Sequence, residues 1–410
     1  MFRIALTLIT TLFLSGCGGG SSGVHKDISI RIIDCNFYNV NDNEQLIYIV
    51  LGSTCTDLKY QIEIEALGVS SLHEMTLNSS IEFVQGPHRR RIEMHVENSW
   101  RKIENEKSWT GRDGAGLVFL NGYLYLLGGW NYSAVTNEVW RTKNIVDWER
   151  LPDAPWEARH GAGWVVHDKK MWVIGGDLID DVWFSPDGIS WTMALSSAPF
   201  GKRYTPSAIS SGEYIYLYGG QRWTPVDWCN SRPDCLPVGL NDVWRSQNGV
   251  DWEQIQPDAP WGGRSLIHGG LYFNNEIFII GGGLKNAVER YSETYSEFED
   301  IWSSSDGINW KKELDKFSFP ARTHFSVMAT LNGCYLSDGS VSTQRNVSND
   351  LFFATDCINY TQLKTPKEMQ RRHGSSLANF NGSVIILAGS PLEQPGTAIW
   401  QYFPNLANSQ

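Results

Sequence analysis

The sequence is short of positive charge. Its 410 residues include 34 lysines and arginines against 45 aspartates and glutamates, a formal net charge of −11, and no long basic tract interrupts this balance. Because nucleic-acid binding depends on neutralising phosphates with lysine and arginine, we do not expect nucleic acid as a partner. The chain also lacks a glycine-rich phosphate loop, a nucleotide motif and a Ser/His/Asp arrangement, so no cofactor is expected and no motif indicates a catalytic class.

Long apolar runs are also missing, apart from one at the N-terminus. Residues 4–14 are mostly apolar and follow Arg3. The run is too short to cross hydrocarbon as a helix, and a charge followed by a short apolar stretch is typical of a signal peptide. We therefore expect residues 1–16 to be removed from the mature protein.

The end of this run carries a lipidation signal. The letters "LSGC" at 14–17 resemble the lipobox of bacterial lipoproteins, which implies that Cys17 becomes the lipidated first residue. An ordinary cleaved signal peptide is the alternative. Gly18 stands where an aspartate often retains lipoproteins in the inner membrane, so the resemblance implies the outer membrane, with the lipid as the only membrane anchor. Residues 17–23 should form a flexible tether.

Six cysteines remain after Cys17, an even number in an exported and oxidising setting. CxxC spacing and Cys/His pairing are absent, which argues against a zinc site. The sequence alone leaves the disulfide connectivity open. The pairs that their positions favour are Cys35 with Cys55, Cys229 with Cys235, and Cys334 with Cys357.

The pattern of "WEARHGAG" at 156–163 recurs along the chain, in each case as a large side chain three residues before an arginine that heads an apolar strand. The spacing of these arginines runs from 44 residues (203 minus 159) to 61 residues (264 minus 203). Repeats of this length are typical of propeller blades. The six arginines at the equivalent position are Arg112, Arg159, Arg203, Arg264, Arg322 and Arg372.

Each repeat predicts four strands. The second strand ends in a glycine pair, which decays to Asp338-Gly339 and Ala388-Gly389 in the last two units. The third strand opens with an acid and an aromatic, and a further aromatic follows eight residues later across a tight turn, so the two rings should fill the gap between blades. The acids are Glu138, Asp181, Asp242, Asp300 and Asp350.

These features resemble the kelch repeat, and residues 99–404 resemble a six-bladed kelch propeller, an all-β fold. The units lie near 111–156, 157–200, 201–261, 262–319, 320–369 and 370–404. Because "SWRKIENEKSW" at 99–109 is similar to "DWERLPDAPW" at 147–156, residues 99–104 should supply the outer strand of the last blade. Such a closure joins the chain ends and removes the exposed sheet edges.

Residues 24–97 do not fit the repeat. The segments 47–52 and 61–68 alternate apolar and polar side chains, which indicates half-buried strands. We expect a small β-sandwich-like domain, which serves either as a spacer or as a binding module.

One end of the propeller should carry the ligand site. In an antiparallel blade, the start of the first strand and the end of the second lie at the same end, so the arginines and the long loops at 221–240 and 283–299 share a face. Aromatic loops around such a ring are where a propeller holds a ligand. The candidate ligand-binding residues are the six arginines with Trp130, Arg222, Trp223, Trp228 and Tyr291. Cys334 and Cys357 fall on adjacent strands at the opposite end, within reach of a disulfide.

Two interpretations of the arginines stay open. Each arginine pairs with the acid of its own third strand, or several guanidinium groups stay free and collect an anionic ligand, as the kelch resemblance implies. Histidines at 160, 268, 324 and 373 lie close by; because they come from different blades at uneven depths, we expect satisfied core residues and no metal site.

Two functions are therefore expected. The first is a non-enzymatic envelope lipoprotein that binds an anionic protein or glycan, including an assembly role with another envelope protein. The alternative is a carbohydrate-active enzyme similar to N-acetylneuraminate epimerase, also an exported kelch propeller. An enzyme of this kind needs acid and base side chains that converge beside the arginines, whereas a binding scaffold does not.

Replacing Cys17 with serine should release the protein from membranes, because the lipid is expected to be its only anchor. Fractionation of cells with detection of the protein in the soluble pool measures this, with an integral outer-membrane protein as the control. Unchanged membrane association of the variant contradicts the lipoprotein hypothesis.

Overall fold

The computed structural model describes most of the chain. The described residues are 12–13, 28–32, 37–42, 46–51, 59–66, 69–76, 80–85, 88–96, 98–104, 109–131, 133–224, 236–265, 269–285, 295–341, 346–390 and 398–404. All regular elements within these ranges are β-strands, and none of the described residues forms a helix long and apolar enough to cross a membrane.

The chain divides into two compact units. One contains residues 1–101 together with 381–384 and 402–410, and the other contains 102–380 and 385–401, so the division passes through the edge of the last blade.

The N-terminal unit holds two four-stranded sheets. One has the order β1 (Leu12–Phe13), β2 (Ile28–Ile32), β5 (Lys59–Ala66) and β6 (Val69–Thr76). The other has the order β3 (Phe37–Asp42), β4 (Leu46–Leu51), β8 (His88–Val96) and β7 (Ser80–Gln85), with β4 and β8 parallel. The segments predicted as strands are thus strands; β-sandwich packing of the two sheets stays a prediction.

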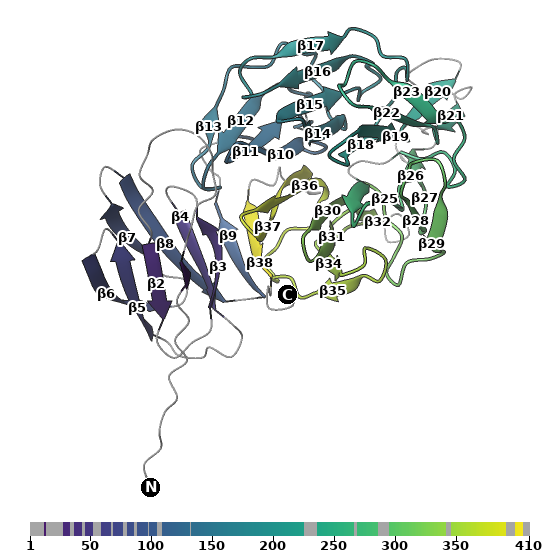
Figure 1. Cartoon of the computed structure of the whole chain (residues 1–410). Helices are drawn as coiled ribbons and strands as arrows, with labels where there is room; N and C mark the ends of the chain where they lie inside the picture. Colours follow the sequence, from purple (N-terminus) through teal and green to yellow (C-terminus); the bar gives the residue numbers. More distant parts are fainter. Residues whose placement is uncertain are drawn as a thin grey trace. The chain divides into compact units, whose positions relative to one another are not determined.

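Six further four-stranded sheets follow one another around a ring (Figure 1). Blades 1 to 3 consist of β10 (Gly116–Leu120), β11 (Tyr123–Leu127), β12 (Val139–Thr142) and β13 (Glu149–Arg150); β14 (Gly163–His167), β15 (Lys170–Ile174), β16 (Val182–Ser185) and β17 (Thr192–Leu195); and β18 (Ser207–Ser210), β19 (Ile215–Tyr218), β22 (Val243–Ser246) and β23 (Glu253–Gln256). Blades 4 and 5 consist of β24 (Gly270–Phe273), β25 (Glu276–Ile280), β28 (Ile301–Ser304) and β29 (Lys311–Leu314); and β30 (Ser326–Thr330), β31 (Gly333–Ser337), β34 (Leu351–Ala354) and β35 (Thr361–Leu363). The six-bladed propeller predicted from the sequence is confirmed.

The sixth blade closes the ring with both ends of the propeller sequence. Its order is β36 (His373–Phe380), β37 (Ser383–Ser390), β38 (Ile399–Phe403) and then β9 (Ser99–Ile103), as predicted. Ile103 of β9 is buried in an apolar cluster with Leu124 and Leu126 of the first blade and Ile385 of the sixth. The closure is therefore held by hydrophobic burial as well as by strand pairing.

Apolar side chains pack between neighbouring blades. Trp164 and Val173 of blade 2, for example, share a cluster with Tyr125 and Leu127 of blade 1. On the axis, the innermost strands enclose a cavity of about 130 Å³, with Ser207, Ser326 and Ser376 among its lining residues.

Three loops that follow the second strands form hairpins of their own. They are β20 (Gln221–Thr224) with β21 (Leu236–Gly239), β26 (Gly283–Lys285) with β27 (Tyr295–Glu297), and β32 (Ser340–Val341) with β33 (Asn346–Val347). The insertions of blades 3 to 5 are thus partly ordered strand pairs.

A disulfide links Cys334 of β31 to Cys357, which follows β34, with the Cα atoms 5.1 Å apart. This is the pair predicted for the end opposite the arginines. The predicted pairs Cys35–Cys55 and Cys229–Cys235, and the lipidation residue Cys17, lie outside the described residues.

Turns between the third and fourth strands place a glycine under an aromatic ring of the preceding blade. Gly249 has a φ of +70°, and a Cβ atom there would lie 2.1 Å from Cζ3 of Trp172. The ring leaves no space for a side chain, so the glycine is required both for backbone conformation and for packing between blades.

Gly249→Ala should therefore lower the free energy of unfolding by about 2–4 kcal/mol, which combines left-handed strain with overpacking. The matched control is Gly212→Ala, because Gly212 has a φ of +91° but a Cβ atom there would meet nothing within 4 Å. It should cost only about 1 kcal/mol, from backbone strain alone. Urea unfolding of both variants measures the difference, and equal losses contradict the packing argument.

Candidate functional site

Each ring arginine lies at the base of its blade, where its guanidinium group joins three segments. In blade 2, Arg159 donates from Nη1 to the carbonyl oxygen of Gly175 at 3.1 Å and to Oδ1 of Asp181 at 2.5 Å, while Nη2 donates to Oδ2 at 3.0 Å. Nε donates to the carbonyl oxygen of Glu157 at 2.9 Å. One side chain thus ties the entry to the first strand, the end of the second and the start of the third.

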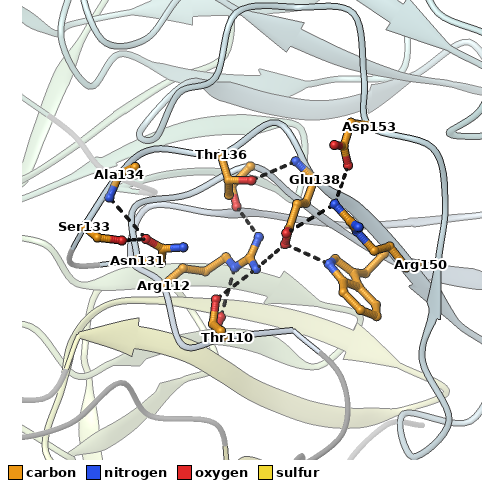
Figure 2. Close-up of polar contacts among 11 residues, drawn as sticks. Thr110, Arg112, Asn131, Ser133, Ala134, Thr136, Glu138, Arg150 and Asp153 are labelled. Carbon is orange, nitrogen blue, oxygen red and sulfur yellow. Dashed lines mark hydrogen bonds and ion pairs between the residues drawn. The ribbon is translucent and has the colours of Figure 1, made fainter.

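Blade 1 repeats this arrangement with a glutamate (Figure 2). Nη2 of Arg112 donates to Oε2 of Glu138 at 2.6 Å, and Nη1 donates to the carbonyl oxygen of Gly128 at 3.1 Å. Burial alone would raise the pKa of Glu138, but hydrogen bonds from Arg112 and Trp140 and the charges of Arg112 and Arg150 lower it. The carboxylate therefore stays ionised beside the buried cation.

All six arginines are at most 1% exposed. Five of them form an ion pair within their own blade, which is the structural alternative left open by the sequence. The pairs are Arg112–Glu138, Arg159–Asp181, Arg203–Asp242, Arg264–Asp300 and Arg322–Asp350. Direct ligand binding by these guanidinium groups would require the ion pairs to break. At these five positions the guanidinium group is already bound to a carboxylate.

The recurring aromatics complete the pair. The indole N–H of Trp183 donates to Oδ2 of Asp181 at 2.8 Å, and Trp156, three residues before the arginine, packs edge-on against Trp191 at a centroid distance of 5.8 Å. The third-strand aromatic thus holds the carboxylate, and the aromatic before the arginine is the partner of the later one. Both Trp183 and Trp191 pack in the apolar cluster between blades 1 and 2, as the eight-residue spacing predicted.

Blade 5 shows what happens without an indole. Its third-strand aromatic is Phe352, which has no N–H, and Nη2 of Arg322 lies 3.4 Å from Oδ2 of Asp350. Gln362 donates to Oδ1 of Asp350 at 2.9 Å. An amide from the outer strand thus donates to the carboxylate that an indole holds in blades 1 to 4.

Blade 6 has no acid at the start of its third strand. Arg372 donates instead to the carbonyl oxygens of Ala388 and Ala398 at 2.9 and 3.4 Å, and no described carboxylate lies within ion-pair distance. Arg372 interacts electrostatically with Asp338 of blade 5, whose Oδ2 accepts from Ser375 at 2.5 Å. Burial raises the pKa of Asp338 to about 7, against the opposing charge of Arg372 and the hydrogen bond from Ser375.

The other predicted ligand-binding residues lie in different surroundings. Arg222 is exposed on β20, whereas Trp223 is 5% exposed and packs against Tyr204 at 5.6 Å, so it is not a free platform for a sugar. Trp130 is partly exposed and its backbone pairs with that of Asp113. Trp228 and Tyr291 lie outside the described residues.

Polar side chains gather at the residues that directly follow the arginines. We call Asp113, His160, Tyr204, His324 and His373 the axial cluster; His324 is two residues after its arginine and the others are one. Backbone hydrogen bonds link these segments around the axis: Gly161 to Gly114 at 2.8 Å, Gly114 to Gly374 at 3.0 Å and Gly374 to His324 at 2.6 Å. The cluster is therefore built on backbone segments of blades 2, 1, 6 and 5 that are hydrogen-bonded in a row.

His160 is held on both sides of its ring. Nδ1 lies 2.8 Å from Oδ2 of Asp177, which also accepts from the His160 backbone N–H at 2.7 Å, and Nε2 lies 3.3 Å from the hydroxyl of Tyr204. Burial alone would lower the pKa of His160, but the hydrogen bond and charge of Asp177, with the charge of Asp113, raise it. A carboxylate that orients a histidine in this way is the arrangement of a general acid or base.

His373 and His324 continue the cluster on the other side of Asp113. Nε2 of His373 lies 3.4 Å from Oδ2 of Asp113, and the rings of His373 and His324 are 5.6 Å apart. Burial and the charges of His373, Lys285 and His160 hold the pKa of His324 well below its ordinary value. His324 also has a φ of 54°, close to that of the equivalent residues two positions after other ring arginines, such as Gly114 and Gly161 at 56° and 57°, so this conformation is a feature of the repeat.

The hairpins of blades 3 and 4 are clamped beside the cluster. The buried side chain of Gln221 donates to the carbonyl oxygen of Lys285 at 2.6 Å and accepts from its N–H at 2.9 Å. The Gln221 backbone pairs with that of Tyr204. The loops that follow the glycine pairs thus lie at the arginine end, as the strand order predicted.

The sequence interpretation missed this cluster because it treated the histidines as separate core residues. A signal was present: the residue after the arginine is polar in every repeat. No group of three or more His, Cys, Asp or Glu side chains in the described part of the chain is placed to hold a metal ion. His268 lies outside the described residues.

No model of a known protein family matches the chain, and no curated protein sequence matches it significantly. The structure establishes the six-bladed propeller, and the kelch type stays a prediction from the repeat pattern.

Asp181→Ala should lower the free energy of unfolding by about 3 kcal/mol, because it leaves the buried Arg159 without its counter-charge. The control is Glu149→Ala, which removes the exposed partner of Arg141 and should cost at most about 1 kcal/mol. Chemical denaturation measures both. A loss for Asp181→Ala no larger than for the control contradicts a structural role for the ion pair.

Proposed function

We propose that the chain is a kelch-type propeller lipoprotein of the outer membrane that binds an acidic glycan or protein at the arginine end of the propeller. The kelch type is supported by the repeated arginines, glycine pairs and acid–aromatic pairs. The anchor and the location are supported by the sequence at 14–17.

The axial cluster is the observation that carries this proposal. Five blades contribute titratable or hydroxyl-bearing side chains to it. Partial burial of such groups lowers the folding stability, and a cluster of them is typical of a functional site. His160, Asp177 and His373 keep side-chain exposures of 16%, 18% and 27%, so a ligand can reach them. The buried arginines support this cluster as scaffold.

An acidic ligand is supported by positive charge beside the cluster. His160 has a raised pKa, and Lys285 lies close enough to influence both His160 and His324. The carboxylate of Asp177 accepts from the backbone N–H of His160, and that of Asp113 lies 3.4 Å from Nε2 of His373; these neighbours reduce the repulsion that the carboxylates would exert on an anion. Aromatic side chains at this end, such as Trp130, suit a sugar ring.

A second candidate function is a carbohydrate-active enzyme of the N-acetylneuraminate epimerase type. The specific observation in its favour is that acid and base side chains do converge beside the arginines. His160 is held by a carboxylate, and His324 lies in surroundings that favour its neutral form.

His373→Ala should weaken the binding of an acidic sugar at least about ten-fold, or roughly 1.4 kcal/mol, without lowering the melting temperature. The test is calorimetric titration of the full-length protein with N-acetylneuraminate, glucuronate oligosaccharides and neutral oligosaccharides. The control is Leu331→Ser, a fully exposed position in the turn between β30 and β31. Absence of binding to every sugar, or equal affinity of His373→Ala, contradicts the proposal.

A further inference from the structure

One acidic side chain of the ring has surroundings unlike those of the five acids in the ion pairs. Asp338 directly follows β31 of blade 5, where blades 1 to 4 carry the first glycine of the pair, and it bonds Ser375 of blade 6. Asp338 is 0% exposed, whereas the five acids of the ion pairs keep side-chain exposures of 13–28%. Among the described residues, Asp338 has no cation within ion-pair distance.

The carboxyl group of Asp338 also has few hydrogen bonds for a buried group. Oδ2 lies 2.5 Å from Oγ of Ser375, and Oδ1 has no hydrogen-bond partner in the part of the chain that the structure describes. The hydroxyl group of Ser375 is neutral and is itself buried. Because a charge removed from water needs hydrogen bonds or a counter-ion, these surroundings favour the protonated form of the carboxyl group.

The guanidinium groups that interact with Asp338 are engaged elsewhere. Arg322 pairs with Asp350. Arg372 donates to three backbone carbonyl oxygens, and its Nη2 makes no hydrogen bond to any described residue. Burial raises the pKa of Asp338 most and the charge of Asp350 adds to this effect, whereas the charges of Arg372 and Arg322 and the hydrogen bond from Ser375 oppose it, which leaves the pKa at about 7.

We propose that Asp338 holds a proton in the folded protein, and that loss of this proton weakens the contact between blades 5 and 6. The protonated carboxyl group is uncharged and can donate a hydrogen bond to Ser375, so its burial costs little. The ionised group is a buried anion without an ion pair. The proposal concerns the ring itself and is independent of the proposed function.

The same contact between blades carries part of the axial cluster. Gly374 donates to the carbonyl oxygen of His324 at 2.6 Å. In the sequence, Gly374 lies between His373 of the cluster and Ser375, the residue that bonds Asp338. Ionisation of Asp338 should therefore loosen the segments that hold both histidines, which makes pH a control on the arginine end of the propeller.

The direction of the pH dependence follows from the two states of the protein. An aspartate has a pKa of about 3.9 in an unfolded chain, against about 7 for Asp338 in the folded protein. The stability that the proton supplies is therefore fully present below the unfolded pKa and is lost as the pH rises through about 7. His160 and His324 also have shifted pKa values, so the contribution of Asp338 is the difference between wild type and a variant without its carboxyl group.

The test compares the full-length wild type with Asp338→Asn, whose amide has the same shape. Calorimetric unfolding at about pH 5.5, in buffers of different ionisation enthalpy, should show that wild type releases about one proton more than the variant. The melting temperature of wild type should fall relative to that of the variant as the pH rises through about 7. The matched control is Asp168→Asn, which removes an exposed carboxyl group at a residue that also has a left-handed φ, 46°, and should release as many protons as wild type.

Hydrogen exchange locates the effect. The amides of Gly339 and Gly374 donate across the contact between blades 5 and 6, and that of Gly129 donates across the contact between blades 1 and 2. From about pH 6 to about pH 8, the protection factors of Gly339 and Gly374 should fall about ten-fold more in wild type than in Asp338→Asn. The protection of Gly129 should be the same in both proteins.

If Asp338→Asn fails to fold, Asp338→Gly takes its place, because it restores the glycine of blades 1 to 4. The infrared C=O band of a protonated carboxyl group needs no variant: wild type should show it at acidic pH and lose it as the pH rises through about 7. Equal proton release by wild type and the Asp338 variant, or absence of that infrared band, overturns the proposal. Neither measurement uses a sugar, so a failure here leaves the proposed function standing, and absence of sugar binding leaves this proposal standing.

Discussion

The propeller depends on a buried ion pair between an arginine and the acid that opens the third strand of the same blade. A guanidinium group has five donors in a plane, so a single side chain can bond the start of one strand, the end of a second and the acid of a third. Arg159 makes all of these contacts in blade 2. Because the cation is fully buried, removing its counter-charge should greatly lower the free energy of unfolding.

Fixing the arginine also fixes the residue after it. The carbonyl oxygen of Arg159 accepts from Gly129 of the preceding blade at 2.9 Å, and that of Arg372 accepts from Gly339 at 3.2 Å, so the backbone at these two arginines joins neighbouring blades. The residue after the arginine is then directed toward the axis, because these hydrogen bonds fix the backbone that carries it. His160 and His373 reach the axial cluster in this way, which is how a structural repeat supplies a preorganised set of polar groups.

The sequence predicted the blades and the strand that closes the ring. Period, glycine pairs and the acid–aromatic pairs determine the blades, and the similarity of 99–109 to 147–156 located the closing strand, because both follow from local spacing. The site depends on the direction of side chains. Arg159 and Trp223 have the chemistry of ligand-binding residues, yet one is sequestered by Asp181 and the other by Tyr204. His324 comes to the cluster by tertiary arrangement across the ring, which no spacing in one repeat reveals.

The last blade keeps the arginine but not the ion pair. Blade 6 keeps its arginine but has Ala398 where the acid would bond, and the adjacent blade carries Asp338 in place of the first glycine of the pair. Asp338 has a φ of 60°, a strained value for a side chain, yet it puts a carboxyl group within electrostatic reach of Arg372. What looks like decay of the repeat in the sequence places a carboxyl group of one blade where it interacts electrostatically with the arginine of its neighbour.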